Sequence, residues 1–140
     1  MKILELLTPK RKIGNLGEAA AVKYLKRHKY KILEKNYVSK NHEIDIIAKR
    51  GDVIAYAEVK ARTVTDGALY ESRPAAAVTP AKQRAIISAA SYYHKVHGEG
   101  LRARFDVIEI YLIDTPRGKR VDKIIHLEGT FNKDTAYGRA

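Results

Sequence analysis

The sequence predicts one mixed α/β domain, with a central mixed sheet flanked by helices in the order α-β-β-β-α-β. Three observations predict it. Apolar residues recur at helical spacing before residue 28, three short segments rich in β-formers follow with turn residues between them, and a well-capped second helix leads into another strand. The 140 residues, 45% of them hydrophobic, suffice to close one core.

The first helix is expected from Ile13 to about His28. Its apolar residues recur three or four positions apart, and lysines occupy the opposite side. The expected core-facing residues are Leu16, Ala19, Ala20, Val22 and Leu25. Residues 1–12 contain Pro9 and a basic cluster, and they are expected to form a flexible basic arm.

Three strands are expected next, at Tyr30–Val38, His42–Ala48 and Val53–Ala61. Short polar segments, Ser39–Asn41 and Lys49–Asp52, separate them. Such short connections favour antiparallel neighbours, so the three strands should form a meander.

The second helix is expected to begin at Thr79-Pro80 and to stop at Gly98. Threonine suits the N-cap, proline suits the first helical position, and glycine suits the end. The expected apolar stripe consists of Ala85, Ala89, Tyr92 and Val96. Before this helix, Arg62–Val78 shows no periodicity and should form a long loop.

Arg104–Leu112 alternates in polarity and should be a strand parallel to the preceding one, because a helix connects the two. Val121–Leu127 is a short last strand in this interpretation. The domain then spans residues 13–131, and residues 132–140 form a polar tail.

Composition limits the chemistry. The chain has no cysteine, which excludes disulfides, zinc-thiolate sites and cysteine nucleophiles, so a catalytic metal would need oxygen or imidazole ligands. Oxygen ligands favour Mg²⁺ or Mn²⁺. No apolar run is long enough to span a membrane and no signal peptide is evident, so a cytoplasmic protein without membrane contact is expected.

The net charge of +11 is concentrated at the N-terminal end. Residues 1–40 hold 11 Lys and Arg against 3 Asp and Glu. A field of this sign attracts polyanions, and nucleic acid is the expected partner. A merely solubilising basic surface is the alternative.

Glu58 and Lys60 lie two positions apart in a predicted strand, so they share one face. Asp45 interrupts the apolar run of Ile44 and Ile46 in the neighbouring strand. Two carboxylates can chelate a hard divalent cation, and a lysine beside them can stabilise the charge that develops on a phosphate. The alternative is an ordinary salt bridge between Glu58 and Lys60 on a half-exposed strand.

Glu18 shares the helix face of Ala21, Val22 and Leu25, so it is a candidate to point toward the sheet. Its spacing from Asn15 also fits a capping box, in which Glu18 would serve only the helix start. The sequence leaves both interpretations open.

A basic cluster occupies the first turn of the second helix, where positive charge is unfavourable against the helix dipole. Phosphate binding would explain it, and a solvated first turn is the alternative. The expected nucleic-acid-binding residues are Lys82, Gln83, Arg84, Lys10, Arg11, Lys12 and Arg62. The histidines show no metal-binding spacing and receive no role.

Four segments in this order resemble the YraN-like family of small bacterial proteins. They are Gly17–Ala20, Glu43–Ala48, Ala57–Arg62 and Val78–Ala85. That family in turn resembles the PD-(D/E)XK nuclease superfamily, which includes Holliday-junction resolvases. The resemblance implies a restriction endonuclease-like core. One departure is His42, where the family usually has glycine; it lies beside the expected site.

The resemblance also implies roles. Asp45, Glu58 and the carbonyl of Val59 would bind Mg²⁺ or Mn²⁺, Lys60 would be the catalytic lysine, and Glu18 would complete the metal site. The expected function is metal-dependent hydrolysis of nucleic-acid phosphodiester bonds, with DNA the expected substrate, including branched, repair or recombination intermediates. A homodimer is compatible with such substrates. The rival is a non-catalytic nucleic-acid-binding or assembly module that retains the fold.

Overall fold

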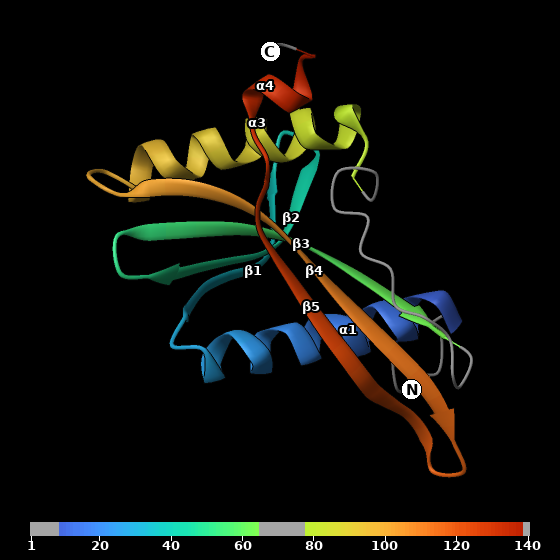
Figure 1. Ribbon diagram of the computed structural model, residues 1–140. Coiled ribbons are helices and arrows are strands. Elements are labelled where there is room, and N and C mark those ends of the chain that lie inside the picture. Colours follow the sequence, from blue (N-terminus) through green and yellow to red (C-terminus); the bar gives the residue numbers. More distant parts are fainter. Residues whose placement is uncertain (1–8, 65–77, 139–140) are drawn as a thin grey trace, which may run out of the picture.

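The computed structural model describes residues 9–64 and 78–138, which form a five-stranded mixed sheet with helices on both faces (Figure 1). The strands lie in chain order across the sheet. They are β1 (Lys31–Ser39), β2 (His42–Arg50), β3 (Val53–Thr63), β4 (Arg102–Thr115) and β5 (Gly118–Phe131). The predicted α-β-β-β-α-β order is confirmed, and β5 follows it.

Strand directions agree with the prediction. β1, β2 and β3 form an antiparallel meander, β4 lies parallel to β3, and β5 returns antiparallel to β4. The last strand is longer than Val121–Leu127, because it pairs with β4 along almost its whole length (Figure 1). These cross-strand hydrogen bonds stabilise Gly118–Arg120, a segment whose sequence alone does not predict a strand.

Helix α1 (Pro9–Arg27) covers one face of the sheet. The prediction of a flexible arm over residues 1–12 was wrong for residues 9–12, which belong to this helix; residues 1–8 lie outside the described part. The predicted core stripe was also displaced. Ala21 and Leu25 are buried, whereas Ala19 is exposed and Leu16 is 46% exposed. The buried stripe continues through Gly17, four residues before Ala21.

The contact at Gly17 gives a testable prediction. A Cβ atom there would lie 2.5 Å from Ala61 Cβ of β3, whereas a Cβ at Gly14 would meet nothing within 4 Å. Gly17→Ala should therefore lower the free energy of unfolding by about 1–2 kcal/mol, because helix and strand must move apart. The matched Gly14→Ala should raise it by about 0.5–1 kcal/mol through helix propensity. Urea unfolding of both variants checks the opposite signs; destabilisation by Gly14→Ala would contradict them.

Helix α3 (Pro80–His97) covers the other face. Its predicted start is confirmed, because the Thr79 side chain accepts the Lys82 N–H and Pro80 opens the helix; Gly98 caps its end. Its predicted stripe was partly wrong. The core side includes Ile86, Ile87, Ala89, Ala90 and Tyr93, whereas Tyr92 and Val96 are exposed. Ala89 fits both stripes, so spacing alone did not identify the buried side.

The predicted polar tail is partly helical. Asn132 caps α4 (Lys133–Ala136), and Ala136 is buried against α3. The tail prediction failed because hydrogen bonds from α3 hold this segment, including Arg84 Nη1 to the Ala136 carbonyl at 2.8 Å. Within residues 9–64 and 78–138, no helix is long and apolar enough to cross a membrane.

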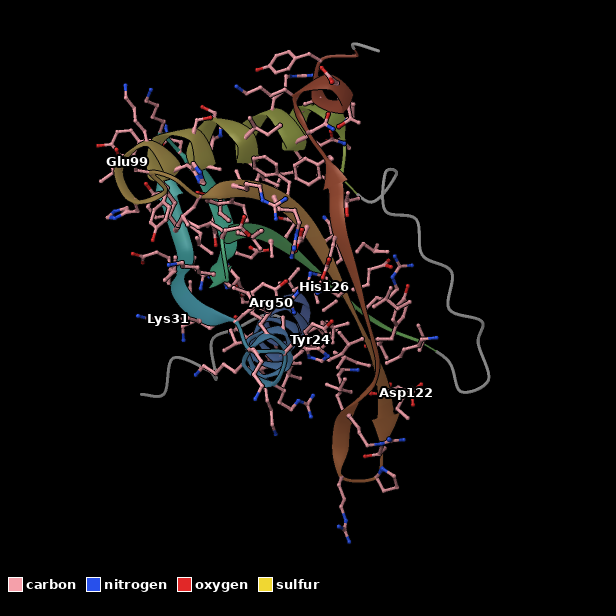
Figure 2. All side chains as sticks on the ribbon, turned by 60° about the vertical axis from the view of Figure 1, so that its left-hand side comes forward. Tyr24, Lys31, Arg50, Glu99, Asp122 and His126 are labelled. Atoms are coloured by element: carbon pink, nitrogen blue, oxygen red, sulfur yellow. The ribbon has the colours of Figure 1, made fainter. Side chains whose placement is uncertain are left out.

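A buried polar network joins α1 to the β4–β5 pair. Asp106 is fully buried and accepts hydrogen bonds from Arg104 Nη2 at 2.7 Å, His126 Nε2 at 2.8 Å and the Gly129 N–H at 3.0 Å. The other ring nitrogen of His126 lies 3.2 Å from the Tyr24 hydroxyl of α1. Figure 2 shows Tyr24 and His126 close together beside α1. The network therefore stabilises the edge of the sheet opposite β1.

Candidate active site

The candidate active site lies where β2 and β3 part. Their ladder ends at the Ile46–Ala57 pair; beyond it β2 continues beside β1, and β3 beside β4. Asp45 Oδ2 accepts the backbone N–H of Val59 at 2.8 Å across this fork. The end of the ladder thus lets an aspartate side chain bind the backbone of the neighbouring strand.

Glu58 and Lys60 share the α3 face of β3, as predicted. Lys60 Nζ lies 3.6 Å from Glu58 Oε1, and Glu58 is only 7% exposed. Glu58 Oε2 is buried without a hydrogen-bond donor. This oxygen therefore requires a proton on the carboxyl group or a bound cation.

The carboxyl groups of Asp45 and Glu58 interact directly. Burial raises the pKa of Glu58 to about 7, and the Asp45 charge adds to this, while Lys82 and Lys60 oppose it. Burial also raises the pKa of Asp45, although the Val59 N–H and the hydrogen bond with Glu58 lower it. Without a cation, the raised pKa values therefore favour one proton held by the pair over two charged carboxylates.

Glu18 approaches from α1 and lines the same hollow as Asp45. With the Asn36 amide nitrogen turned toward the carboxylates, it donates to Glu18 Oε1 at 2.6 Å and to Glu43 Oε1 at 2.9 Å. Burial raises the pKa of Glu18, with further contributions from Asp45 and Glu43. Of the two open interpretations, the structure supports Glu18 facing the sheet rather than a helix cap, because α1 begins at Pro9.

The basic cluster of α3 divides into three different roles. The positive charge of Lys82 acts on both Asp45 and Glu58, so this residue lies beside the carboxylates. The expectation for Gln83 was wrong: it is buried, donates to the Val78 carbonyl at 2.9 Å and accepts from Thr135 Oγ1 at 2.8 Å. Arg84 is exposed but is directed to α4, where it binds the Ala136 carbonyl.

The other predicted nucleic-acid-binding residues lie near the N-terminus of α1 and the end of β3. Arg11 lines a hollow with Glu18, and Lys12 is exposed in the same helical turn. Lys10 is part of α1, and its side chain lies outside the described structure. Arg62 is exposed two residues beyond Lys60 on the same face.

Two polar residues beside the site escaped the sequence interpretation. Asn36 occupies a left-handed backbone position (φ 52°), which a strand prediction does not reveal. Glu109 is an acid between two buried isoleucines of β4, the same signal that singled out Asp45. Glu109 could therefore have been found from the sequence.

The donor set fits a hard divalent cation. Asp45 and Glu58 supply carboxylate oxygens side by side, and one of these oxygens lacks any donor. Mg²⁺ commonly takes one or two protein carboxylates and completes its coordination with water or phosphate. Among the described residues no group of three or more His, Asp or Glu side chains forms a complete metal site. Glu18 therefore borders this pair rather than joining it directly.

The fold and the site define a small α/β protein with a paired-carboxylate centre and an adjacent lysine at a sheet fork. The family model of the uncharacterised protein family UPF0102 matches residues 17–110, and the chain belongs to this family. This confirms the YraN-like resemblance. The matched segment includes all four proposed site residues: Glu18, Asp45, Glu58 and Lys60.

Curated relatives support the assignment. A UPF0102 protein of Chlorobium phaeobacteroides is 44% identical over 70% of this chain and 75% of its own length. A UPF0102 protein of Clostridioides difficile is 43% identical over 81% of this chain and 93% of its own length. One from Chloroflexus aurantiacus is 33% identical over 91% of this chain and 98% of its own.

Proposed function

We propose that this protein is a metal-dependent nuclease that hydrolyses phosphodiester bonds of nucleic acid, with DNA as the expected substrate. One observation carries the proposal. The buried carboxyl group of Glu58 and the half-buried one of Asp45 face each other at the sheet fork, one Glu58 oxygen has no donor, and Lys60 Nζ lies 3.6 Å from the other. A protein gains no stability from such an arrangement unless a cation compensates it.

Asp45 and Glu58, with the Val59 carbonyl, would hold Mg²⁺ or Mn²⁺, and Glu18 would complete the site from the hollow that it lines with Asp45. The cation would supply Lewis-acid polarisation of the scissile phosphate. The Val59 N–H fixes the orientation of Asp45 at 2.8 Å. Lys60 would stabilise the negative charge that grows on the phosphate oxygens, because its ammonium group borders Glu58.

Basic residues on both sides of the fork would bind the flanking backbone. Lys82 comes from the first turn of α3, Arg62 from the end of β3, and Arg11 and Lys12 from α1. Phosphate contacts of this kind position a nucleic acid without reading its sequence. The same set fits branched intermediates of repair or recombination, for which a homodimer would present two such sites.

The second candidate is a non-catalytic nucleic-acid-binding module. The observation that favours it is the lack, among the described residues, of a three-ligand metal site. Against it stands the repulsion between phosphate and the two neighbouring acids, Asp45 and Glu58, in the absence of a cation. The nuclease therefore remains the proposed function.

A panel of labelled DNA and RNA substrates tests the proposal directly. Duplexes, single strands, flaps and four-way junctions are incubated with Mg²⁺, with Mn²⁺ or with EDTA. Cutting that requires the cation and is lost in Glu58→Ala supports the nuclease. Binding without cutting, equal in EDTA and in either metal, supports the binding module instead.

Glu58→Gln should stabilise the metal-free protein at high pH and abolish its stabilisation by metal. The folded-state pKa of Glu58 is raised from 4.5 to about 7, so the metal-free fold loses stability as pH rises through this interval. At pH 8 the variant should therefore be more stable than the wild type without metal, by about 2 kcal/mol. The difference should vanish toward pH 4.

Stabilisation by metal should be lost in the same variant. Mn²⁺ should raise the melting temperature of the wild type, more at pH 8 than at pH 6, because binding must displace the Glu58 proton. Glu58→Gln and Asp45→Asn should both lose this rise. Thermal melts with and without Mn²⁺ measure both effects, and an undiminished rise in Glu58→Gln would contradict the assigned ligand.

A further inference from the structure

Glu109 of β4 is a buried acid that borders the candidate site. It is 1% exposed and lies between Ile108 and Ile110. The parallel β3–β4 ladder pairs it with Lys60, and paired residues on neighbouring strands share one face of the sheet. Glu109 therefore lies on the face that carries Glu58 and Lys60.

Its contacts are directed to Arg62. Glu109 Oε2 lies 3.9 Å from Arg62 Nη2 and accepts the Tyr111 hydroxyl at 3.2 Å. The Arg62 guanidinium carbon lies 5.7 Å from the centroid of the Tyr111 ring. The Arg62 side chain is still 55% exposed. One side of the guanidinium is thus held by the protein, and the rest is accessible.

Packing alone does not account for this acid. Glu109 Oε1 is buried without a hydrogen-bond partner, an arrangement that lowers stability relative to an apolar residue. Its neighbours on the same face of β4, Val107 and Tyr111, are buried, so the position would accept an apolar side chain. A guanidinium held in place by a carboxylate and an aromatic ring loses less entropy when it binds a phosphate.

We propose that Glu109 is a positioning residue that orients Arg62 to bind a second backbone phosphate, next to the phosphate held at Glu58 and Lys60. The inference rests on the proposed function and deepens it. Lys60 and Arg62 are two residues apart on one strand, ~6.7 Å, which is comparable to the spacing of neighbouring phosphates along a nucleic-acid strand. The substrate is then a polynucleotide that spans both positions.

The direction in which Glu109→Gln changes the affinity for DNA tests the proposal. A labelled DNA duplex is titrated with protein in Ca²⁺, which takes oxygen ligands. Glu109→Gln removes a negative charge, so electrostatics alone predicts tighter binding; loss of Arg62 orientation predicts about tenfold weaker binding. Glu99→Gln changes an exposed acid in the turn between α3 and β4 (Figure 2); it is the charge-matched control and should bind as the wild type or slightly more tightly.

Two further variants connect the effect to Arg62. Arg62→Gln should weaken binding as much as Glu109→Gln, and the double variant should be no weaker than either, because the two act as one unit. The melting temperature of Glu109→Gln should equal or exceed that of the wild type. If the Glu109→Gln variant binds DNA as tightly as the wild type, or more tightly, the proposal is overturned.

Side-chain NMR separates this inference from the proposed function. The Arg62 Nε–H signal of the wild type should show an ordered guanidinium, and Glu109→Gln should make it mobile. If the wild type binds no nucleic acid, the proposed function fails, and the Arg62 signal alone decides about Glu109. An Arg62 guanidinium equally ordered in both proteins would overturn its positioning role.

Discussion

Lys60→Ala is expected to slow metal-dependent cleavage by about 10²–10³-fold, the usual loss when a group that stabilises transition-state charge is removed. The Lys60 ammonium lies 3.6 Å from Glu58 Oε1, beside the proposed position of the scissile phosphate, and Lys60 is not among the proposed metal ligands. Mn²⁺ affinity should therefore persist, or increase slightly as a positive charge leaves. Single-turnover cleavage and Mn²⁺ titration together measure the two effects.

The matched control is Lys31→Ala, which removes an exposed lysine at the start of β1 (Figure 2), a strand separated from β3 by β2. It should cut at the wild-type rate. Glu58→Gln differs from Lys60→Ala because it should lose both Mn²⁺ binding and cleavage. Equal cleavage by Lys60→Ala and the wild type would assign Lys60 to a surface salt bridge, the alternative that the sequence left open.

Asp106→Asn is expected to lower the free energy of unfolding by about 3 kcal/mol, because it removes the fully buried carboxylate that Arg104 and His126 bind. Asp106 Oδ2 accepts from Arg104 Nη2 at 2.7 Å and His126 Nε2 at 2.8 Å, and Oδ1 accepts from Arg104 Nε and the Gly129 N–H. An amide NH2 group in place of either oxygen therefore leaves two donors without an acceptor. Urea unfolding at pH 7 measures the loss. Asp122→Asn, an exposed acid of β5, is the control and should change the value by less than about 0.5 kcal/mol.

The difference in unfolding free energy between the wild type and Asp106→Asn should depend on pH. Burial alone would raise the pKa of Asp106, but the hydrogen bonds from His126, Arg104 and Gly129 outweigh it and lower the pKa. A lowered folded-state pKa contributes stability above the unfolded value of about 4, and this contribution is lost as pH falls through the folded value. The gap between wild type and Asp106→Asn should therefore narrow below pH ~4. A gap that widens in acid would contradict the assigned direction.

Local signals predicted most of the elements and some of the site. Thr79 and Pro80 predicted the start of α3, because capping and proline geometry act within one turn. Glu58 and Lys60 were correctly expected on one face, because strand alternation is a local property. Gln83 was misassigned, because its burial depends on α4, more than fifty residues away in the chain.

By itself, the sequence determined the α/β class, the order of the elements, the excess of positive charge and the unusual acids of the strands. These follow from local periodicity and composition. Only the tertiary structure decided that the β2–β3 ladder ends at Ile46–Ala57, which joins Asp45 to the Val59 N–H. It also decided that α3 brings Lys82 to this fork and that Glu109 contacts Arg62. The physical reason is that register and helix placement depend on contacts between segments distant in the chain, which local propensity does not encode.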